Sequence, residues 1–194
     1  MKKNSVGFFL VLALALGLLL SGCGGKQAGP FAGREPADMS GYAGLKDYKG
    51  KIFLTDTTVK EAAALMDEGK SFVLFASFAN CPFCNRLIPE LCAAAEEEGL
   101  WIGYLNTRKN PAWNNNMDID DYDLFVERFG EYLPLDANQV KHLYVPALIA
   151  VKDGKAVDFH QGVVEGADNP SEPLTDSQRE QLKKELKAFF EKIR

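Results

Sequence analysis

The C-P-F-C motif at residues 81–84 is the part of this chain best suited to chemistry, because of the type and spacing of its two cysteine side chains. Two thiols at this spacing can open and close as a disulfide, so they can exchange disulfides with another molecule. The motif follows an apolar run at residues 71–78 and stands at the head of a helix-like segment. A thiol at a helix N-terminus faces unpaired N–H groups and the positive end of the helix dipole. We therefore expect Cys81 to have a lowered pKa and to be the exposed nucleophile, with Cys84 as the resolving thiol.

Two other roles of a C-x-x-C pair remain open: a structural disulfide and half of a zinc site. Zinc sites normally have four ligands of N or S chemistry. Only His142 and His160 are available to join the pair, and their spacing does not suit a ligand set. We therefore expect no metal and no other cofactor. Cys92 would lie about 12 Å beyond Cys84 on a straight helix, too far for a disulfide, and is expected to be a buried apolar residue.

Residues 1–22 predict a secretory signal. Lys2 and Lys3 precede an apolar run of about 15 residues, which small residues follow. The run is shorter than the roughly 20 residues that span a bilayer comfortably, and an uncleaved membrane anchor is the alternative. The sequence L-S-G-C at residues 20–23 resembles the lipobox of bacterial lipoproteins. This resemblance implies cleavage before Cys23, lipidation of Cys23, and an extracytoplasmic protein that is lipid-anchored to a bacterial membrane.

Composition and charge fit a small secreted globular protein. Removing residues 1–22, which carry two lysines and no acid, changes the formal net charge from −5 to −7. This charge argues against nucleic acid as a partner. The rest of the chain is long enough to bury the core of one domain. Residues 23–50 are rich in Gly, Ala and Pro, and we expect a lipidated cysteine and a flexible tether there, although Tyr42, Leu45 and Tyr48 favour packing of its last third on the domain.

The remaining residues predict alternating strands and helices. Apolar runs indicate strands, Thr58 begins a capping-box pattern, and Asp153-Gly154 is typical of a two-residue hairpin turn. An apolar stripe near the C-terminus predicts an amphipathic helix. The expected strands cover residues 51–55, 71–78, 100–106, 147–152 and 155–160, and the expected helices cover residues 58–68, 86–98, 118–132 and 175–194.

From about residue 51 to residue 194, the chain resembles a thioredoxin-fold protein. The strand, the dithiol with its helix, the closing hairpin and the final helix stand in the order of that fold, and so does Val145-Pro146. The resemblance implies an α/β domain with a central mixed sheet flanked by helices. It also implies that Pro146 is cis and lies opposite the dithiol, whereas the residues alone would favour an ordinary trans proline. Val145 would then pair with an extended substrate backbone, and the substrate-binding residues would be Val145, Pro146, Pro82 and Phe83.

The chain departs from thioredoxins at the dithiol and ahead of Val145. Phe75 stands where thioredoxins carry a buried acid that assists proton transfer, and Pro82-Phe83 replaces their Gly-Pro. Proline at the first of these two positions resembles glutaredoxins and Dsb-type oxidases. The connection at about residues 108–143 is longer than in thioredoxin and predicts an inserted acidic helix. We expect this insertion either to shape a substrate groove or to decorate the surface.

The chain also resembles thioredoxin-like lipoproteins and bacteriocin-transport-accessory-like proteins of bacteria, which share the apolar strand and a C-P-x-C dithiol. This resemblance defines no substrate. The lipobox, the dithiol at the start of a helix and Val145-Pro146 together predict a membrane-anchored thiol–disulfide oxidoreductase that acts on protein substrates, with a membrane electron donor or acceptor as a further partner. The alternatives are a non-catalytic binding module or export accessory protein, and a structural disulfide or metal site. The direction of exchange stays open, and we expect an intermediate reduction potential.

Overall fold

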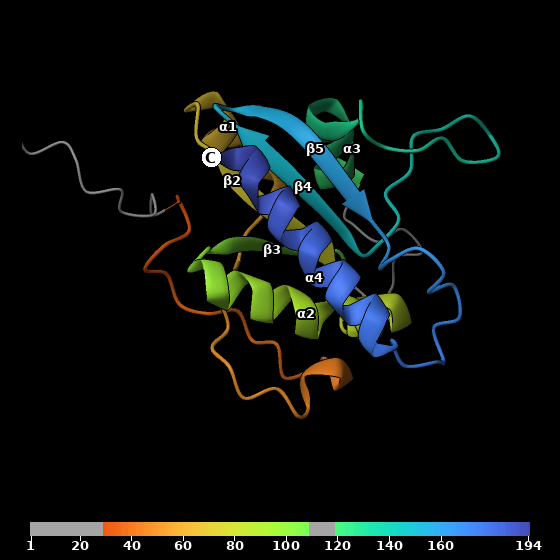
Figure 1. The fold of residues 1–194 in the computed structure, drawn as a ribbon. Coiled ribbons are helices and arrows are strands. Elements are labelled where there is room, and N and C mark those ends of the chain that lie inside the picture. Colours follow the sequence, from red (N-terminus) through yellow and green to blue (C-terminus); the bar gives the residue numbers. More distant parts are fainter. Residues whose placement is uncertain (1–28, 109–118) are drawn as a thin grey trace, which may run out of the picture.

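The computed structural model describes residues 29–108 and 119–194, and its centre is a mixed five-stranded sheet (Figure 1). The strands are β1 (Leu54–Asp56), β2 (Phe72–Ser77), β3 (Ile102–Asn106), β4 (Ala147–Lys152) and β5 (Lys155–Gln161). Their order in the sheet is β1-β3-β2-β4-β5. β1, β2 and β3 are parallel, whereas β4 pairs antiparallel with β2 and with β5.

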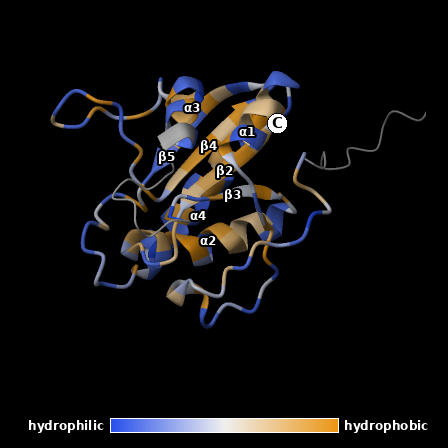
Figure 2. Cartoon of the chain, turned by 180° about the vertical axis from the view of Figure 1, so that it is seen from behind, coloured by the Kyte–Doolittle hydropathy of each residue, from blue (hydrophilic) through white to orange (hydrophobic). Residues whose placement is uncertain are grey.

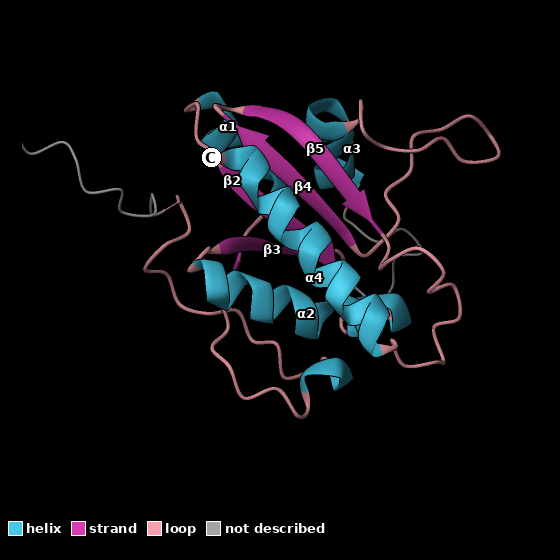
Figure 3. Ribbon diagram, viewed as in Figure 1, coloured by secondary structure: helices cyan, strands magenta, loops and turns pink. Residues whose placement is uncertain are grey.

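Helices cover both faces of this sheet. They are α1 (Val59–Asp67), α2 (Pro82–Glu98), α3 (Ile119–Phe129) and α4 (Asp176–Phe190), with short 3-10 turns η1 (Ala43–Leu45) and η2 (Glu191–Ile193). Figure 3 shows α2 and α4 in front of the sheet and α1 and α3 behind it. The expected α/β class, with a mixed sheet flanked by helices, is confirmed, and this arrangement is compatible with a thioredoxin-like fold.

The core consists of two apolar layers, one on each face of the sheet. Val73 and Phe75 of β2 pack in the layer shared with α2 and α4, whereas Phe72 and Leu74 pack in the layer shared with α1 and α3. This alternation follows from the two-residue period of a strand. A strand buried on both faces must be apolar throughout, which explains the continuous hydrophobic run of β2. Figure 2 shows the hydrophobic colouring concentrated in the central strands.

Individual residues set the ends of several elements. The Thr58 side chain caps α1, and Thr175 begins α4 with a capping box. Gly99 ends α2 in the left-handed conformation, where a side chain would be strained. Asp153 and Gly154 have φ angles of 49° and 77° in the turn between β4 and β5. These features match the predicted cap and hairpin, because short polar residues and glycine suit such backbone geometry.

Two elements differ in extent from the prediction. α2 begins at Pro82 rather than at residue 86, because the fixed φ of proline suits the first helical position and its missing N–H costs nothing there. The dithiol therefore lies in the first turn of α2 itself. β1 is confined to Leu54–Asp56, the three residues that pair with β3.

Residues 29–50, here named the strap, pack on the domain along more of their length than expected, because we expected a flexible tether with only its last third packed. Phe31, Met39 and Tyr42 of the strap are buried. The Phe31 ring packs edge-on against Phe72, with the ring centroids 5.6 Å apart. It also lies so close to Gly103 that a Cβ there would come within 2.5 Å of the ring. The strap therefore belongs to the folded domain, and it runs along α2 as the orange segment of Figure 1.

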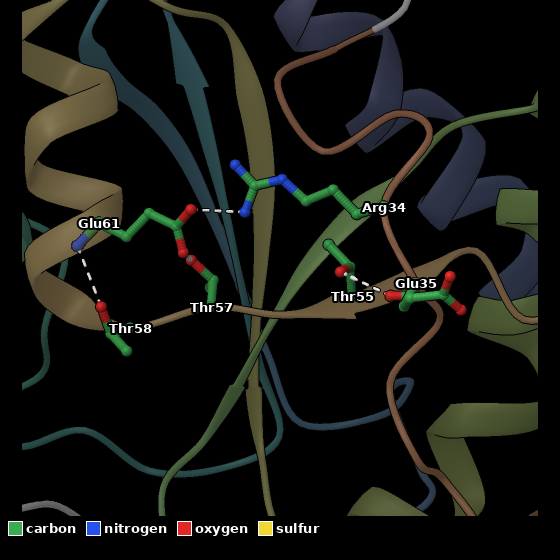
Figure 4. Close-up of polar contacts among 6 residues, drawn as sticks. All are labelled: Arg34, Glu35, Thr55, Thr57, Thr58 and Glu61. Atoms are coloured by element: carbon green, nitrogen blue, oxygen red, sulfur yellow. Dashed lines mark hydrogen bonds and ion pairs between the residues drawn. The ribbon is translucent and has the colours of Figure 1, made fainter.

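Polar contacts fasten the strap to the β1 edge and to α1 (Figure 4). Arg34 pairs with Glu61 of α1, and the second carboxylate oxygen of Glu61 accepts a hydrogen bond from Thr57 at 2.8 Å. The Thr55 hydroxyl donates to the backbone carbonyl of Glu35, also at 2.8 Å. Burial opposes the negative charge of Glu61, but the bonds from Arg34 and Thr57 outweigh it and lower the pKa of that carboxyl.

The helix predicted in the insertion is present as α3. The remainder of the insertion at residues 109–118 lies outside the described residues. So do the predicted signal at residues 1–22 and the lipid attachment site Cys23, which stay predictions. Across residues 29–108 and 119–194, no helix combines the length and hydrophobicity needed to cross a membrane.

Candidate functional site

The cysteine pair lies where β2 leads into α2. Cys81 and Cys84 are disulfide-bonded, and their Cα atoms are 5.1 Å apart. Cys81 is the N-cap residue of α2, and its Sγ accepts a hydrogen bond from the backbone N–H of Cys84 at 3.2 Å. This N–H has no partner within the helix, so it stabilises negative charge on the Cys81 sulfur once the disulfide is reduced. The first turn of α2 thus favours Cys81 as the thiolate of the pair.

Asn85 holds the turn that precedes Cys81. Its side-chain nitrogen donates to the backbone carbonyls of Ala79 at 2.6 Å and Cys81 at 3.0 Å. Its side-chain oxygen accepts from the N–H of Gly44, in the strap, at 2.8 Å. One amide side chain therefore joins the dithiol turn to the strap. No local pattern signals this role, because asparagine early in a helix normally suggests only a local cap.

The peptide bond between Val145 and Pro146 is cis, as the resemblance implied. The Val145 carbonyl oxygen lies 3.7 Å from Cys81 Sγ. In the disulfide form Cys81 has no S–H, so this is a contact, whereas a reduced thiol could donate there. Among the described residues, neither the N–H nor the carbonyl of Val145 has a backbone partner. The Pro146 carbonyl accepts from the N–H of Gly162 at 2.9 Å, which joins this loop to the segment after β5.

The dithiol is more enclosed than the sequence suggested. Cys81 is only 4% exposed and Cys84 is fully buried, although we expected Cys81 to be open to solvent. The accessible part of the motif is formed by Pro82, which is exposed, and Phe83, which is half-buried. A partner that reaches the Cys81 sulfur must therefore lie against these side chains.

The core behind the dithiol contains hydroxyl groups instead of an acid at position 75. Phe75 is fully buried, with its ring centroid 6.1 Å from that of Tyr104. The Tyr42 hydroxyl forms hydrogen bonds with Ser77 at 2.7 Å and with Tyr104 at 3.0 Å. Burial raises the pKa of Tyr42 and of Tyr104, so both phenols stay neutral and are poor bases.

Cys92 occupies the middle of α2 and is fully buried, which confirms the prediction of a buried residue. It forms no disulfide. Burial, with a smaller contribution from the charge of Glu96, raises the pKa of its thiol to about 12. At neutral pH this thiol is therefore protonated and inaccessible.

A cavity of about 420 Å³ opens beside Phe83. Its lining comes from the dithiol motif, the end of β5, the segment after β5, and α4. The lining includes Phe83, His160, Val163, Glu165, Asp168 and Glu185. Arg86 of α2 fixes the segment after β5, because its Nη1 donates to the carbonyls of Ala167 at 2.7 Å and Asn169 at 2.9 Å. The sequence does not reveal this cavity, because its lining joins a run at residues 160–168 to Phe83 and Glu185, which are distant from that run along the chain.

Within the described ranges, no group of three or more His, Cys, Asp or Glu side chains is arranged to hold a metal ion. The His142 ring contacts the Tyr144 ring at a tilt of 49°, with the ring centroids 4.5 Å apart, and His160 lies on β5. No known family model matches the chain, and a search of curated proteins finds no match either.

Proposed function

We propose that the protein is a thioredoxin-like thiol–disulfide oxidoreductase that exchanges disulfides with protein substrates through Cys81 and Cys84. The observation that carries this proposal is a disulfide in the first turn of α2 with the cis Val145–Pro146 bond beside it. On one side of the site, the N-terminus of α2 stabilises the thiolate of Cys81 and so supports a reactive sulfur. The Val145 backbone, which has no backbone partner in the described chain, supports pairing with a substrate strand on the other side.

Exchange proceeds in two thiolate attacks. In the oxidising direction, a substrate thiolate attacks Cys81 Sγ, the bond between Cys81 and Cys84 breaks, and Cys84 leaves as a thiolate and takes up a proton. A second substrate thiolate then attacks the substrate sulfur of the mixed disulfide, and Cys81 leaves as a thiolate. Two electrons pass from the substrate to the protein, and the substrate gains a disulfide. The same steps in reverse reduce a substrate disulfide.

The neighbouring residues have separate roles in this scheme. The N–H of Cys84 stabilises the Cys81 thiolate, while Pro82 and Phe83 contact the substrate beside the sulfur. Because Phe75 replaces the buried acid, the proton of Cys84 is exchanged with water or substrate rather than with a core carboxylate. A lipid on Cys23 would hold this site outside a bacterial membrane, where a membrane protein would donate or accept the electrons.

A non-catalytic binding module is the second candidate, and a specific observation favours it. Cys81 is only 4% exposed, and the position of the proton-transferring acid is apolar. A protein that holds a peptide against Val145 without exchanging disulfides needs neither an open sulfur nor an acid. A purely structural disulfide would fit the same enclosure.

Cysteine substitutions in the full chain separate these functions. We expect Cys81→Ser to abolish exchange with a peptide disulfide, and Cys84→Ser to accumulate a mixed disulfide on Cys81 that mass spectrometry detects. Cys92→Ala is the matched control and should exchange normally. Undiminished exchange by Cys81→Ser would overturn the proposal. Peptide capture that survives loss of both thiols would indicate the binding module, and lost stability without any exchange in the unaltered chain would indicate a structural disulfide.

A further inference from the structure

The end of the sheet opposite the dithiol gathers several segments that are distant along the chain. The parallel strands β1, β2 and β3 begin there, and so does the turn from β4 to β5, because Phe72 at the start of β2 pairs with Val151 near the end of β4. The C-terminus joins them through a hydrogen bond from the Lys152 side chain to the carbonyl of Arg194. We name this end the entry edge, and it comprises residues 29, 51–53, 68–71, 98–101, 152–155 and 191–194. Figure 1 shows the C-terminus and the start of the strap there, on the opposite side of the domain from the beginning of α2.

The strap joins the folded domain at the entry edge. Its first residue, Gly29, lies beside Ser71, because a Cβ on Gly29 would be 3.9 Å from the Ser71 carbonyl oxygen. Cys23, the predicted lipid attachment site, precedes Gly29 by six residues, and six residues reach at most about 20 Å. The dithiol lies beyond the other end of β2, about 17 Å further along that strand. An anchor at Cys23 therefore keeps the entry edge, rather than the dithiol, close to the bilayer.

An aromatic pair lies at the entry edge. Phe53 and Trp101 directly precede β1 and the first residue of β3, and their ring centroids are 5.2 Å apart. Both residues are half-buried, so part of each remains open to solvent. A tryptophan side chain suits the boundary between lipid headgroups and acyl chains, because its ring is apolar and its N–H is polar. The pair therefore gives this edge a contact that suits the surface of a bilayer.

Charge is distributed unequally between the two ends of the sheet. At the entry edge, lysine and arginine outnumber aspartate and glutamate, and the cations are Lys51, Lys70, Lys152, Lys155, Lys192 and Arg194. At the dithiol end, residues 162–176 contain four acidic residues and no lysine or arginine. The hydrogen bond from Gly162 to Pro146 places this acidic run beside the cis peptide bond. An anionic surface therefore attracts the entry edge and repels the dithiol end, although the chain as a whole is acidic.

We infer that the entry edge rests on the surface of an anionic lipid bilayer, with the dithiol turned towards the aqueous side. Phe53 and Trp101 reach the headgroup level, and the lysines of this edge contact lipid phosphates. This inference goes beyond the proposed function, because disulfide exchange itself needs no membrane. It determines how partners approach: a soluble protein reaches Cys81 directly, and a membrane protein reaches it only through a part that extends past the domain.

Quenching of tryptophan by brominated lipid tests this orientation. The full chain, in its disulfide form, is reconstituted into vesicles of phosphatidylcholine and anionic phosphatidylglycerol whose acyl chains are brominated near the headgroups. Trp113, outside the described residues, is changed to Phe, which leaves Trp101 as the only tryptophan. We expect its fluorescence to be lower in brominated than in unbrominated vesicles. A second reporter, Trp101→Phe, Trp113→Phe, Tyr144→Trp, moves the only tryptophan beside Val145, at a position that is 44% exposed. Its fluorescence should be the same in both kinds of vesicle.

Two charge-matched lysine variants, each carrying Trp113→Phe, locate the contact. Lys51→Gln, Lys70→Gln, Lys155→Gln removes three exposed cations from the entry edge. It should reduce the quenching of Trp101 to the level seen in vesicles of phosphatidylcholine alone. High salt should have the same effect on the parent. The control changes Lys60, Lys141 and Lys184, which are exposed elsewhere, to Gln and should keep the full quenching. Urea unfolding checks that each variant is folded.

Every other pattern of quenching would overturn the inference. Equal quenching of both reporters would show a domain without a preferred orientation, and stronger quenching at position 144 would place the dithiol end on the bilayer. Absence of quenching at Trp101 would show that the entry edge does not meet lipid. Equal losses in the two lysine variants would reflect overall charge alone. These results leave the exchange function standing, because exchange is measured with peptides in solution. Loss of exchange would likewise leave the orientation standing.

Discussion

The first turn of α2 and its middle both carry cysteine, but the two environments differ in nearly every property that controls thiol chemistry. Cys81 caps the helix, accepts the N–H of Cys84, and lies beside the Val145 carbonyl. Cys92 is surrounded by the apolar core and the charge of Glu96, which raise its pKa to about 12. Reactivity on one helix is therefore set by position along the dipole and by burial rather than by residue type.

The strap sharpens this difference. Tyr42 packs in the same core layer as Cys92, and the Tyr48 hydroxyl donates to Glu96 at 3.1 Å, so the strap encloses the middle of α2. At the first turn of α2, one described polar contact joins the strap to the dithiol turn. The Gly44 N–H donates to the Asn85 side chain, which itself donates to the carbonyls of Ala79 and Cys81. The strap thus contributes to the burial of Cys92. It leaves the surface at Pro82 and Phe83, beside Cys81, accessible.

The largest expected difference between Cys81 and Cys92 is in their rates of alkylation. After reduction at pH 7, we expect iodoacetamide to modify Cys81 at least about a thousandfold faster than Cys92, because a thiol of pKa 12 is almost never ionised at this pH. Mass spectrometry of proteolytic peptides measures both rates. In urea, where burial is lost, the rates should converge. Comparable labelling of Cys92 in the native protein would break the comparison.

Alkaline pH should lower the free energy of unfolding, because the buried Cys92 thiol in the middle of α2 resists ionisation. Folding raises the pKa of Cys92 above its unfolded value near 9, so its stabilising contribution is complete below pH 9 and is lost as pH rises towards 12. The loss approaches about 1.4 kcal/mol per pH unit for this group. Burial shifts Tyr42 in the same direction. Urea unfolding between pH 8 and pH 10.5, in the disulfide form, measures the slope.

Cys92→Ala is the matched variant for this pH dependence. It removes the thiol and should give a shallower fall in the free energy of unfolding above pH 9, while Tyr42 keeps its own contribution. A slope that matches the unaltered chain would show that Cys92 ionises normally in the fold, contrary to the comparison.

The smallest expected effect on stability comes from Asn85, whose side chain joins the dithiol turn to the strap. Asn85→Ala removes hydrogen bonds to Ala79, Cys81 and Gly44, and should lower the free energy of unfolding by about 1–2 kcal/mol and speed the reduction of the disulfide. Chemical denaturation and the rate of reduction by dithiothreitol measure these effects. Asn85→Asp keeps the acceptor for Gly44 and loses both donated bonds, so it isolates the dithiol turn. Unchanged stability and reduction rate in Asn85→Ala would refute this role.

Local sequence signals predicted the sheet and its helices because each depends on neighbouring residues. The continuous apolar run of β2, the cap at Thr58 and the turn at Asp153-Gly154 act over a few positions. The apolar pattern predicts the start of α2 too late, because it does not show that Pro82 of the motif is the first helical residue. The cis form of Pro146 came from the resemblance and not from the residues themselves.

The strap and the cavity depend on long-range contacts that no local pattern carries. Phe31 and Met39 are buried without regular spacing, so the composition around them predicted a tether, whereas packing of Tyr42 was expected. Phe83 and Glu185 meet across the cavity only because α4 packs on α2. The enclosure of Cys81 likewise results from the fold, since a thiol at a helix start is usually expected to be open.

A redox titration of the dithiol tests the central claim most directly. The full chain is equilibrated in glutathione buffers, and the fraction of free Cys81 and Cys84 is measured by alkylation and mass spectrometry, with Cys92→Ala as the control. An exchanging dithiol should be half reduced between about −270 and −120 mV, the range of thioredoxin and DsbA. A midpoint below about −300 mV, where structural disulfides lie, would contradict the account.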